Sequence, residues 1–455
     1  MNTVRLAWHH IILHIPETWE VIGYKKDPAE GQLVLADRAG EALNVHWKQM
    51  KSAPVIPRLL TDLVRLGREP KTSQDEDRLE KKIRDRIREV HGWQVYLPDV
   101  DNARPLHPPH RARAAFAARF ENTTGILILL VFPPHPDTAA QEHILEILAS
   151  FAPNDGAERT WAVFGLEFTL PATMELDEVV ALPACQRLLF ENRRGETVAI
   201  HRYGMLPAIL AGDDPATFYA RVKGRRTLLR RAGQFRKDGQ HEGVELTYIT
   251  RGKGGLDSLL AGTWHGRVWL WRCDEEMRLY AIDHHAPAKH HISDLLQRVH
   301  APQPRLAPWP EPPQRHTSRR VAPHHALPSW SEAVRTGDGL LELQLRSIPL
   351  RNEAGQVKPT TEGKTEIIVP LRHRWWSRLL QHVLPLSDTK RVELDEIGAA
   401  VYALCDGEHT VEELIELHRE RWKLSFFEAR AMIFAFLRQL MCRNLILLAT
   451  PRERE

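Results

Sequence analysis

Hydrophobic and polar positions near the C-terminus predict one compact unit in which two strands flank three helices. The predicted elements are a strand over Lys390–Leu394, helices over 395–407, 410–422 and 426–444, and a strand ending at 449. Asp395 can cap the first helix, and Gly407 can end it in the left-handed conformation. The other two helices each follow a capping box, at Thr410 and at Ser425, with glutamate three positions later.

The hydrophobic pattern of the N-terminal region repeats itself at an offset of 155 residues, with nine identities over 35 positions and no gap. The identical pairs are Pro16 and Pro171, Thr18 and Thr173, Glu20 and Glu175, Leu33 and Leu188, Arg38 and Arg193, Gly40 and Gly195, Glu41 and Glu196, His46 and His201, and Met50 and Met205. Each copy predicts a strand ending in proline, a hairpin, and finally a buried strand followed by a helix.

These patterns predict an α+β multidomain protein. The expected parts are tandem α/β sandwich-like domains over 1–153 and 154–301, a Pro/His-rich linker over 302–338, and a winged-helix-like domain over 339–455 with its core at 371–448. Leu340–Pro349 and Lys364–Pro370 alternate enough to form strands. The strand–proline opening and strand–helix ending of the two copies loosely resemble the PsbP-like α/β/α sandwich.

The C-terminal segment resembles the PqqD-like family, the peptide-recognition modules (RiPP recognition elements) of ribosomal peptide modification systems, over roughly 371–448. The residues that carry the resemblance are Leu394, Asp395, Gly398, Val401, Leu404, Asp406, Gly407, Thr410, Val411, Glu413, Leu414, Phe436, Leu437, Leu445 and Ile446. Members of this family are usually small stand-alone domains or fusions to a radical enzyme, so the long N-terminal region is a departure.

The resemblance implies a non-catalytic adaptor that captures a precursor (leader) peptide as an added strand and presents it to a modifying enzyme. An exposed strand edge supplies backbone hydrogen bonds, and an apolar groove selects side chains. The implied strand is Lys390, Arg391, Val392, Glu393 and Leu394. The last long helix carries seven consecutive apolar residues, Ala431 to Leu437, and therefore needs cover on more than one side. Its Met432, Ala435, Arg438 and Gln439 are expected near the groove.

Two other readings of this unit stay open. The second apolar face of the helix can pack against the chain's own N-terminal domains, which would make the protein an interaction scaffold. Three helices with flanking strands also fit a winged-helix DNA-binding protein. A DNA-reading helix needs Arg, Lys, Asn or Gln at base edges. Here Arg430 is alone among Phe426, Phe427, Glu428 and Met432, which disfavours nucleic acid.

Composition narrows the class of protein. The chain has 455 residues, 43% hydrophobic and 27% charged, with 62 basic against 59 acidic residues. That balance favours no polyanionic partner. No apolar stretch is long enough for a membrane span, and the start does not have the pattern of a signal peptide. Four scattered cysteines predict a reduced, cytoplasmic protein and exclude a local cysteine cluster for iron–sulfur chemistry, so a radical-type modifying enzyme would act in trans.

Several motifs are candidates for chemical sites, but we expect no catalytic residue, no metal and no cofactor. The histidines of Asp283–His291 could bind a metal, but such pairs at a helix start are more often solvated. The basic run Arg221–Lys237 could bind an anionic partner, although a solvated helix face is the favoured interpretation. Trp269 and Trp271 share one strand face and are expected in the core, whereas Arg251–Ser258 lacks the spacing of a phosphate loop.

Overall fold

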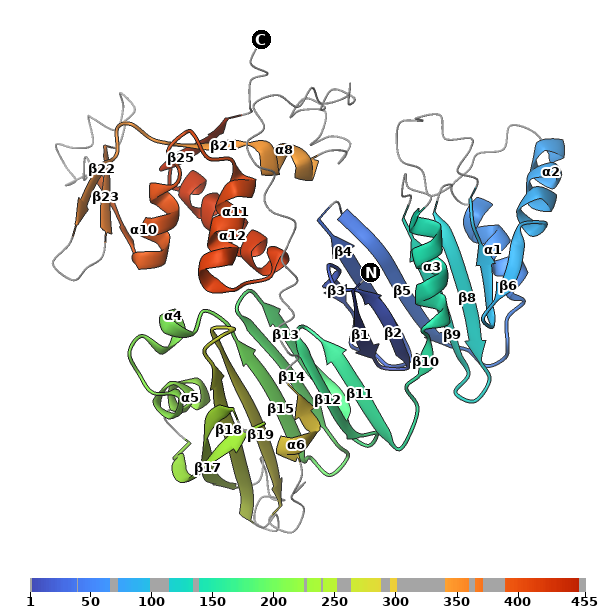
Figure 1. Ribbon diagram of the computed structural model, residues 1–455, viewed down its shortest axis with the longest axis horizontal. Coiled ribbons are helices and arrows are strands. Elements are labelled where there is room, and N and C mark those ends of the chain that lie inside the picture. The colour runs from blue at the N-terminus through green and yellow to red at the C-terminus, as the bar shows by residue number, and fades with distance from the viewer. Residues whose placement is uncertain are drawn as a thin grey trace, which may run out of the picture. The chain divides into compact units, whose positions relative to one another are not determined.

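The computed structural model of this chain describes residues 2–38, 40–65, 73–98, 114–133, 139–224, 227–238, 240–251, 263–287, 295–300, 340–359, 365–370 and 389–449. It has a mixed α/β architecture with antiparallel sheets (Figure 1). The chain divides into two compact units, Met1–Leu306 and Ala307–Glu455. Each unit is described by itself below.

Two seven-stranded sheets of the N-terminal unit have the same connectivity. The first has the order β3-β4-β5-β9-β8-β7-β6 and the second β13-β14-β15-β19-β18-β17-β16, so strands follow one another along the chain in the same way in both. The first sheet consists of β3 (Glu20–Tyr24), β4 (Glu30–Asp37), β5 (Gly40–Gln49), β6 (Ile87–Val90), β7 (Trp93–Tyr96), β8 (Ala115–Glu121) and β9 (Ile126–Phe132). The second consists of β13 (Glu175–Leu182), β14 (Cys185–Glu191), β15 (Thr197–Tyr203), β16 (Arg230–Lys237), β17 (His241–Arg251), β18 (Thr263–Cys273) and β19 (Arg278–Pro287).

A six-stranded sheet joins strands from both halves of this unit, in the order β10-β2-β1-β11-β12-β20. Its strands are β1 (Thr3–Trp8), β2 (Ile11–Pro16), β10 (Ala152–Pro153), β11 (Glu158–Val163), β12 (Leu166–Pro171) and β20 (Val299–His300). The two halves meet where β1 pairs with β11, with Ala7 opposite Ala162. The strands that the sequence predicts at Pro16 and Pro171 are confirmed as β2 and β12, and the two predicted hairpins are confirmed as β4–β5 and β14–β15.

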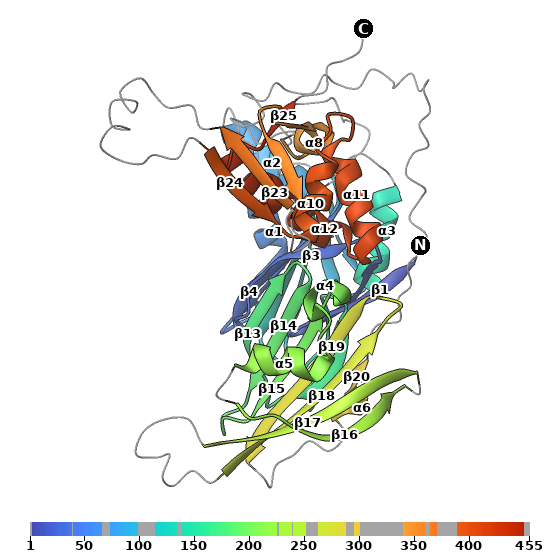
Figure 2. The ribbon, with the colours of Figure 1, turned by 90° about the vertical axis from the view of Figure 1, so that its left-hand side faces the viewer.

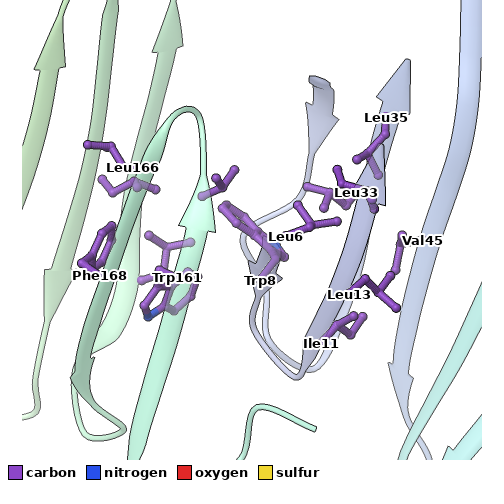
Figure 3. Close-up of a cluster of buried hydrophobic side chains, with 14 of the residues drawn as sticks. Leu6, Trp8, Ile11, Leu13, Leu33, Leu35, Val45, Trp161, Leu166 and Phe168 are labelled. Atoms are coloured by element: carbon purple, nitrogen blue, oxygen red, sulfur yellow. The ribbon is translucent and has the colours of Figure 1, made fainter. Parts of the chain in front are cut away.

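One hydrophobic core runs through the six-stranded sheet and both seven-stranded sheets. Figure 3 shows part of it, in which Leu6, Trp8 and Leu33 lie on one side and Trp161 and Phe168 on the other. The rings of Trp8 and Trp161 pack edge to face, with their centroids 5.6 Å apart. Trp269 and Trp271 are buried in this core, as their spacing predicts.

Helices cover the other face of each seven-stranded sheet through separate apolar clusters. The helices of the N-terminal unit are α1 (Ile56–Arg65), α2 (Ser73–Arg84), α3 (Ala139–Ala149), α4 (Leu206–Leu210), α5 (Pro215–Lys223) and α6 (Leu295–Arg298). The interpretation of Arg221–Lys237 as one helix face is wrong. Helix α5 ends at Lys223 because Gly224 follows with φ of 83°, and Arg230–Lys237 forms the edge strand β16.

The C-terminal unit contains the predicted strand, three helices and closing strand. Its described elements are α8 (Leu340–Arg346), β21 (Ile348–Arg351), β22 (Gln356–Pro359), β23 (Thr365–Pro370), β24 (Thr389–Leu394), α10 (Glu396–Ala403), α11 (Val411–Trp422), α12 (Phe426–Cys442) and β25 (Ile446–Ala449). Asp395 caps α10, and both predicted capping boxes are present. Strands β22, β23 and β24 form one sheet in that order, while β21 pairs with β25.

Two predictions about this unit need correction. Leu340–Pro349 is not one strand, because its first seven residues form α8. Leu, Glu, Gln and Arg all favour helix there, and Glu342 pairs with Arg346 one turn later. Helix α10 ends at Ala403 instead of Gly407. Gly407 does have a positive φ of 88°, but it lies in the loop that follows.

Candidate functional site

Strand β24 lies at the edge of its sheet, and this edge is the candidate peptide site. It pairs with β23 in a register that sets Val392 opposite Ile367 and Leu394 opposite Thr365. Among the residues that the structure describes, no strand pairs with its other side. An edge of this kind presents backbone N–H and C=O groups that can bind a further strand.

Side chains of β24 alternate between the surface and the unit's interior from Arg391 to Leu394, and the strand is exposed before that. Val392 and Leu394 are 4% and 5% exposed and anchor the strand, whereas Lys390, Arg391 and Glu393 are exposed. Arg391 Nη1 lies 3.8 Å from Glu366 Oε1 on the neighbouring strand β23. The five residues that the sequence assigns to the strand therefore divide into two anchors and three surface positions.

Helix α12 carries the remaining predicted site residues. Its N-terminus is fixed by the capping box, in which the backbone N–H of Glu428 donates to Ser425 Oγ at 3.1 Å and the Ser425 N–H donates to Glu428 Oε2 at 3.0 Å. Ile433, Leu437 and Leu440 are buried. Met432 is half-buried, and the other three predicted site residues, Ala435, Arg438 and Gln439, are exposed.

Helix α10 connects the sheet to α12. It packs on β24, and its Gly398 lies against the ring of Phe436 in α12. A Cβ at Gly398 would lie 3.1 Å from that ring and 2.9 Å from Asp395 Oδ1, which in turn accepts the Gly398 N–H at 2.7 Å. The glycine thus allows a close approach of two helices and a compact cap at one position. Figure 2 shows β23, β24, α10 and α12 together in this unit.

The loop after α10 is held by a second set of local bonds. Asp406 accepts the N–H groups of Glu408 and His409 at 2.8 and 3.2 Å, and the His409 ring lies 2.8 Å from it. Burial acts to raise the pKa of Asp406, but these hydrogen bonds and the His409 charge outweigh it and lower the pKa to about 2. At Gly407, a Cβ would lie 2.7 Å from Leu350 of β21, so glycine lets the loop contact that strand.

The other chemical motifs do not form a centre in the described part of the chain. No group of three or more metal-binding side chains occurs there. His284 is not solvated, since it is fully buried in β19 and its Nε2 lies 2.8 Å from Glu196 Oε1. His291 and Arg251–Ser258, apart from the backbone of Arg251 in β17, lie outside the described residues. Burial raises the pKa of Cys405 to about 12, which leaves an unreactive thiol.

Two features of the site were missed by sequence reasoning. Strand β22 lies in a segment that reads as a polar connector, and its alternation over four residues is too short to be a signal. The pairing of β23 with β24 joins residues on either side of 371–388, and periodicity contains no information about such a partner.

No helix of the described residues has the length and apolar character needed to span a membrane.

Comparisons with known proteins bear on the same segment. Residues 381–446 match the family described as "Coenzyme PQQ synthesis protein D (PqqD)". No curated protein matches the chain. Among solved structures, cyanobacterial PsbP (CyanoP) from Synechocystis sp. PCC 6803 is similar over 32% of this chain and 92% of that chain. The sequence identity is 14% and the TM-score is 0.22, which is too low to assign the fold. The C-terminal unit of this chain therefore contains a PqqD-like segment.

Proposed function

We propose that the C-terminal unit captures a precursor peptide as a strand along β24 and presents it to a separate modifying enzyme. The observation that carries this proposal is the edge position of β24, where no further strand of the described residues follows it in the sheet, within a segment similar to PqqD. The chain itself would act by binding, without catalysis. A radical enzyme is one candidate partner, and a reduced cytoplasmic setting suits the four free cysteines.

Surface chemistry supports this edge as the docking strand. Its anchors Val392 and Leu394 fix the backbone, so the exposed edge does not need to fold when a peptide arrives. Half-buried Met432 and exposed Ala435 supply small apolar contacts on α12 for alternate side chains of the added strand.

We also propose that the N-terminal unit arose by duplication of one α+β domain, with parts at 1–153 and 154–301. The 155-residue offset of the sequence and the shared connectivity of the two seven-stranded sheets support this origin. In this view, the linker over 302–338 tethers the peptide-binding domain over 339–455 to a duplicated scaffold.

A matched pair of variants tests the peptide site in the full-length chain. Ala435→Arg places a large charged side chain on α12, and Ala403→Arg makes the same change at an exposed position that ends α10. Fluorescence anisotropy would follow a labelled synthetic copy of a candidate leader peptide. We expect Ala435→Arg to weaken binding about 10-fold or more, a loss of about 1.4 kcal/mol, and Ala403→Arg to leave it within about twofold. Equal affinities for both variants, with retained folding, would count against the site.

A further inference from the structure

A buried carboxylate lies in the second seven-stranded sheet, far in sequence from the PqqD-like segment. Asp283 of β19 is 3% exposed. It accepts hydrogen bonds from the hydroxyls of Tyr219 and Tyr248, both at 2.7 Å, and its Oδ2 lies 2.5 Å from Lys223 Nζ. Burial acts to raise the pKa of Asp283, but the Lys223 charge and these hydrogen bonds outweigh it and hold the pKa below its usual value.

The same place in the first seven-stranded sheet is apolar. Asp283 pairs with Ala199 in the second sheet. The residue 155 positions before Ala199 is Asn44, which pairs with Val131 in the first sheet. Val131 is therefore the residue of the first sheet that corresponds to Asp283. Val131 packs against a hydrophobic cluster under α1. That cluster includes Leu60, Val64, Tyr96 and Phe116. The two sheets thus differ at this position: the first has Val131 in a hydrophobic cluster, and the second has the ion pair of Asp283 with Lys223.

Stability alone does not account for this difference. A buried ion pair must recover the cost of removing two charges from water, and well-packed apolar residues often do as well or better. The first sheet shows that this framework accepts the apolar solution. A buried ionisable group with a specific charge partner is a candidate for a functional site.

The network reaches solvent at one end. Lys223, the last residue of α5, keeps 29% of its side chain exposed and also donates to the Tyr248 hydroxyl at 3.1 Å. The Tyr248 ring lies flat over Gly266, where a Cβ would come within 2.0 Å of it, and stacks on His285 at 5.7 Å. Figure 2 shows α5 beside the strands that carry these residues.

Beyond Tyr248, further polar and aromatic side chains lie on the face of the second sheet that carries Asp283. His285 Nε2 lies 2.6 Å from Thr250 Oγ1, and the half-buried Trp264 ring lies 5.1 Å from the His285 ring. The exposed end therefore combines an ammonium group, a hydroxyl and an indole. An ammonium group has three N–H donors, and two of those of Lys223 are accounted for by Asp283 and Tyr248.

We propose that Lys223, held by Asp283, Tyr219 and Tyr248, binds a small oxyanion at this end of the second sheet, with Thr250 and Trp264 beside it. The buried carboxylate and the two tyrosines fix the ammonium group, and its third N–H receives the anion. A carboxylate and a phosphate share this chemistry, so the ligand is defined as an oxyanion carried by a small molecule or a peptide.

Thermal unfolding of the full-length chain tests this site with acetate and with inorganic phosphate as probes, at pH 7 and at ionic strength held constant with chloride. We expect a rise in Tm that saturates with acetate, with phosphate or with both, and the active probe identifies the class of anion. Lys223→Met should abolish the rise, whereas Lys25→Met, at an exposed position of the same unit, should keep it. No saturating rise in the unmodified chain, or the same rise in Lys223→Met, would overturn the proposal.

A second variant separates binding from folding. A fourfold variant removes every polar group of this network and gives it the apolar character of the cluster in the first sheet. Its substitutions are Lys223→Met, Tyr219→Phe, Tyr248→Phe and Asp283→Val. We expect this fourfold variant to unfold at a Tm no lower than that of the unmodified chain and to lose its response to the active probe. A clearly lower Tm would show that the network serves stability, and a retained response would place the anion elsewhere. Either result would overturn the proposal.

Discussion

Ala7 pairs with Ala162, the residue that lies 155 positions further along the chain. The offset between these partners equals the offset at which the N-terminal sequence matches itself. A second pair repeats the relationship, since the Tyr24 hydroxyl donates to the carbonyl oxygen of Val179 at 3.3 Å. Under the proposed duplication, these residues face their own counterparts, and we expect such pairs to lie close to a local two-fold axis, as in an isologous interface.

The proposed axis leads to a prediction about stability. Ala7 and Ala162 are buried where the two halves join, at 0% and 5% exposure. Ala7→Leu and Ala162→Leu should each destabilise the N-terminal unit by about 1–3 kcal/mol through overpacking, and by similar amounts. Urea unfolding followed by tryptophan fluorescence would measure both. Val4→Leu, at the exposed start of the same strand, serves as the control and should stay within about 0.5 kcal/mol. Strongly unequal effects of the two alanine substitutions would speak against a local axis.

Gly398→Ala provides a test of the contact between α10 and α12. Alanine favours a helix by about 1 kcal/mol over glycine, so an unconstrained position would become more stable. Here the new methyl group would meet the Phe436 ring at 3.1 Å. We therefore expect a net loss of about 1 kcal/mol in the free energy of unfolding, measured by urea denaturation. Adding Phe436→Leu should recover part of the loss, and a stabilised single variant would show that the helices are further apart.

Stability should decrease on mild acidification because of buried histidines. Burial, more than neighbouring charges, lowers the pKa of His9 from 6.5 to about 3 and that of His418 to about 4. Below pH 6.5 the unfolded chain binds protons that the folded chain does not, so the contribution of each histidine is complete above pH 6.5 and decreases as pH falls towards the folded pKa. The loss is at most about 1.4 kcal/mol per pH unit for each group.

Urea unfolding between pH 7 and 5 would measure this dependence. His9 has a φ of 47°, and asparagine accepts that backbone without titrating. His9→Asn should lower the absolute stability but flatten its dependence on pH in the N-terminal unit. His14→Asn, at an exposed position, should leave the slope as it is in the unmodified chain. An unchanged slope in His9→Asn would mean that His9 binds protons in the folded chain as readily as in the unfolded chain.

The sequence predicts well what depends on neighbouring residues. Asp395, Thr410 and Ser425 cap three helices within a few positions, and these contacts are all present. Gly407 was correctly expected to take a positive φ, but the helix ends four residues earlier. Cys405 is fully buried beside β21, whose Arg351 donates its N–H to the Cys405 carbonyl oxygen, so a contact from outside the segment decides where the helix ends.

Features that depend on distant residues were not predictable. The sequence singles out the run Asp283–His291 for its histidines, but it is Asp283 that lies in a buried network of hydrogen bonds and an ion pair. Its partners Lys223, Tyr219 and Tyr248 come from a helix and a strand separated from it by 35 to 64 residues. No local spacing indicates that they meet. The edge position of β24 depends in the same way on its pairing with β23.

The central claim is that β24 receives a peptide strand, and residue-resolved hydrogen exchange of the full-length chain with and without the precursor peptide tests it most directly. In an antiparallel sheet, alternate N–H groups of an edge strand face outward. We predict that either Lys390, Val392 and Leu394 or Thr389, Arg391 and Glu393 gain protection in the complex, while the opposite edge strand, Gln356–Pro359, does not change. Formation of the complex without new protection in Thr389–Leu394 would contradict the account.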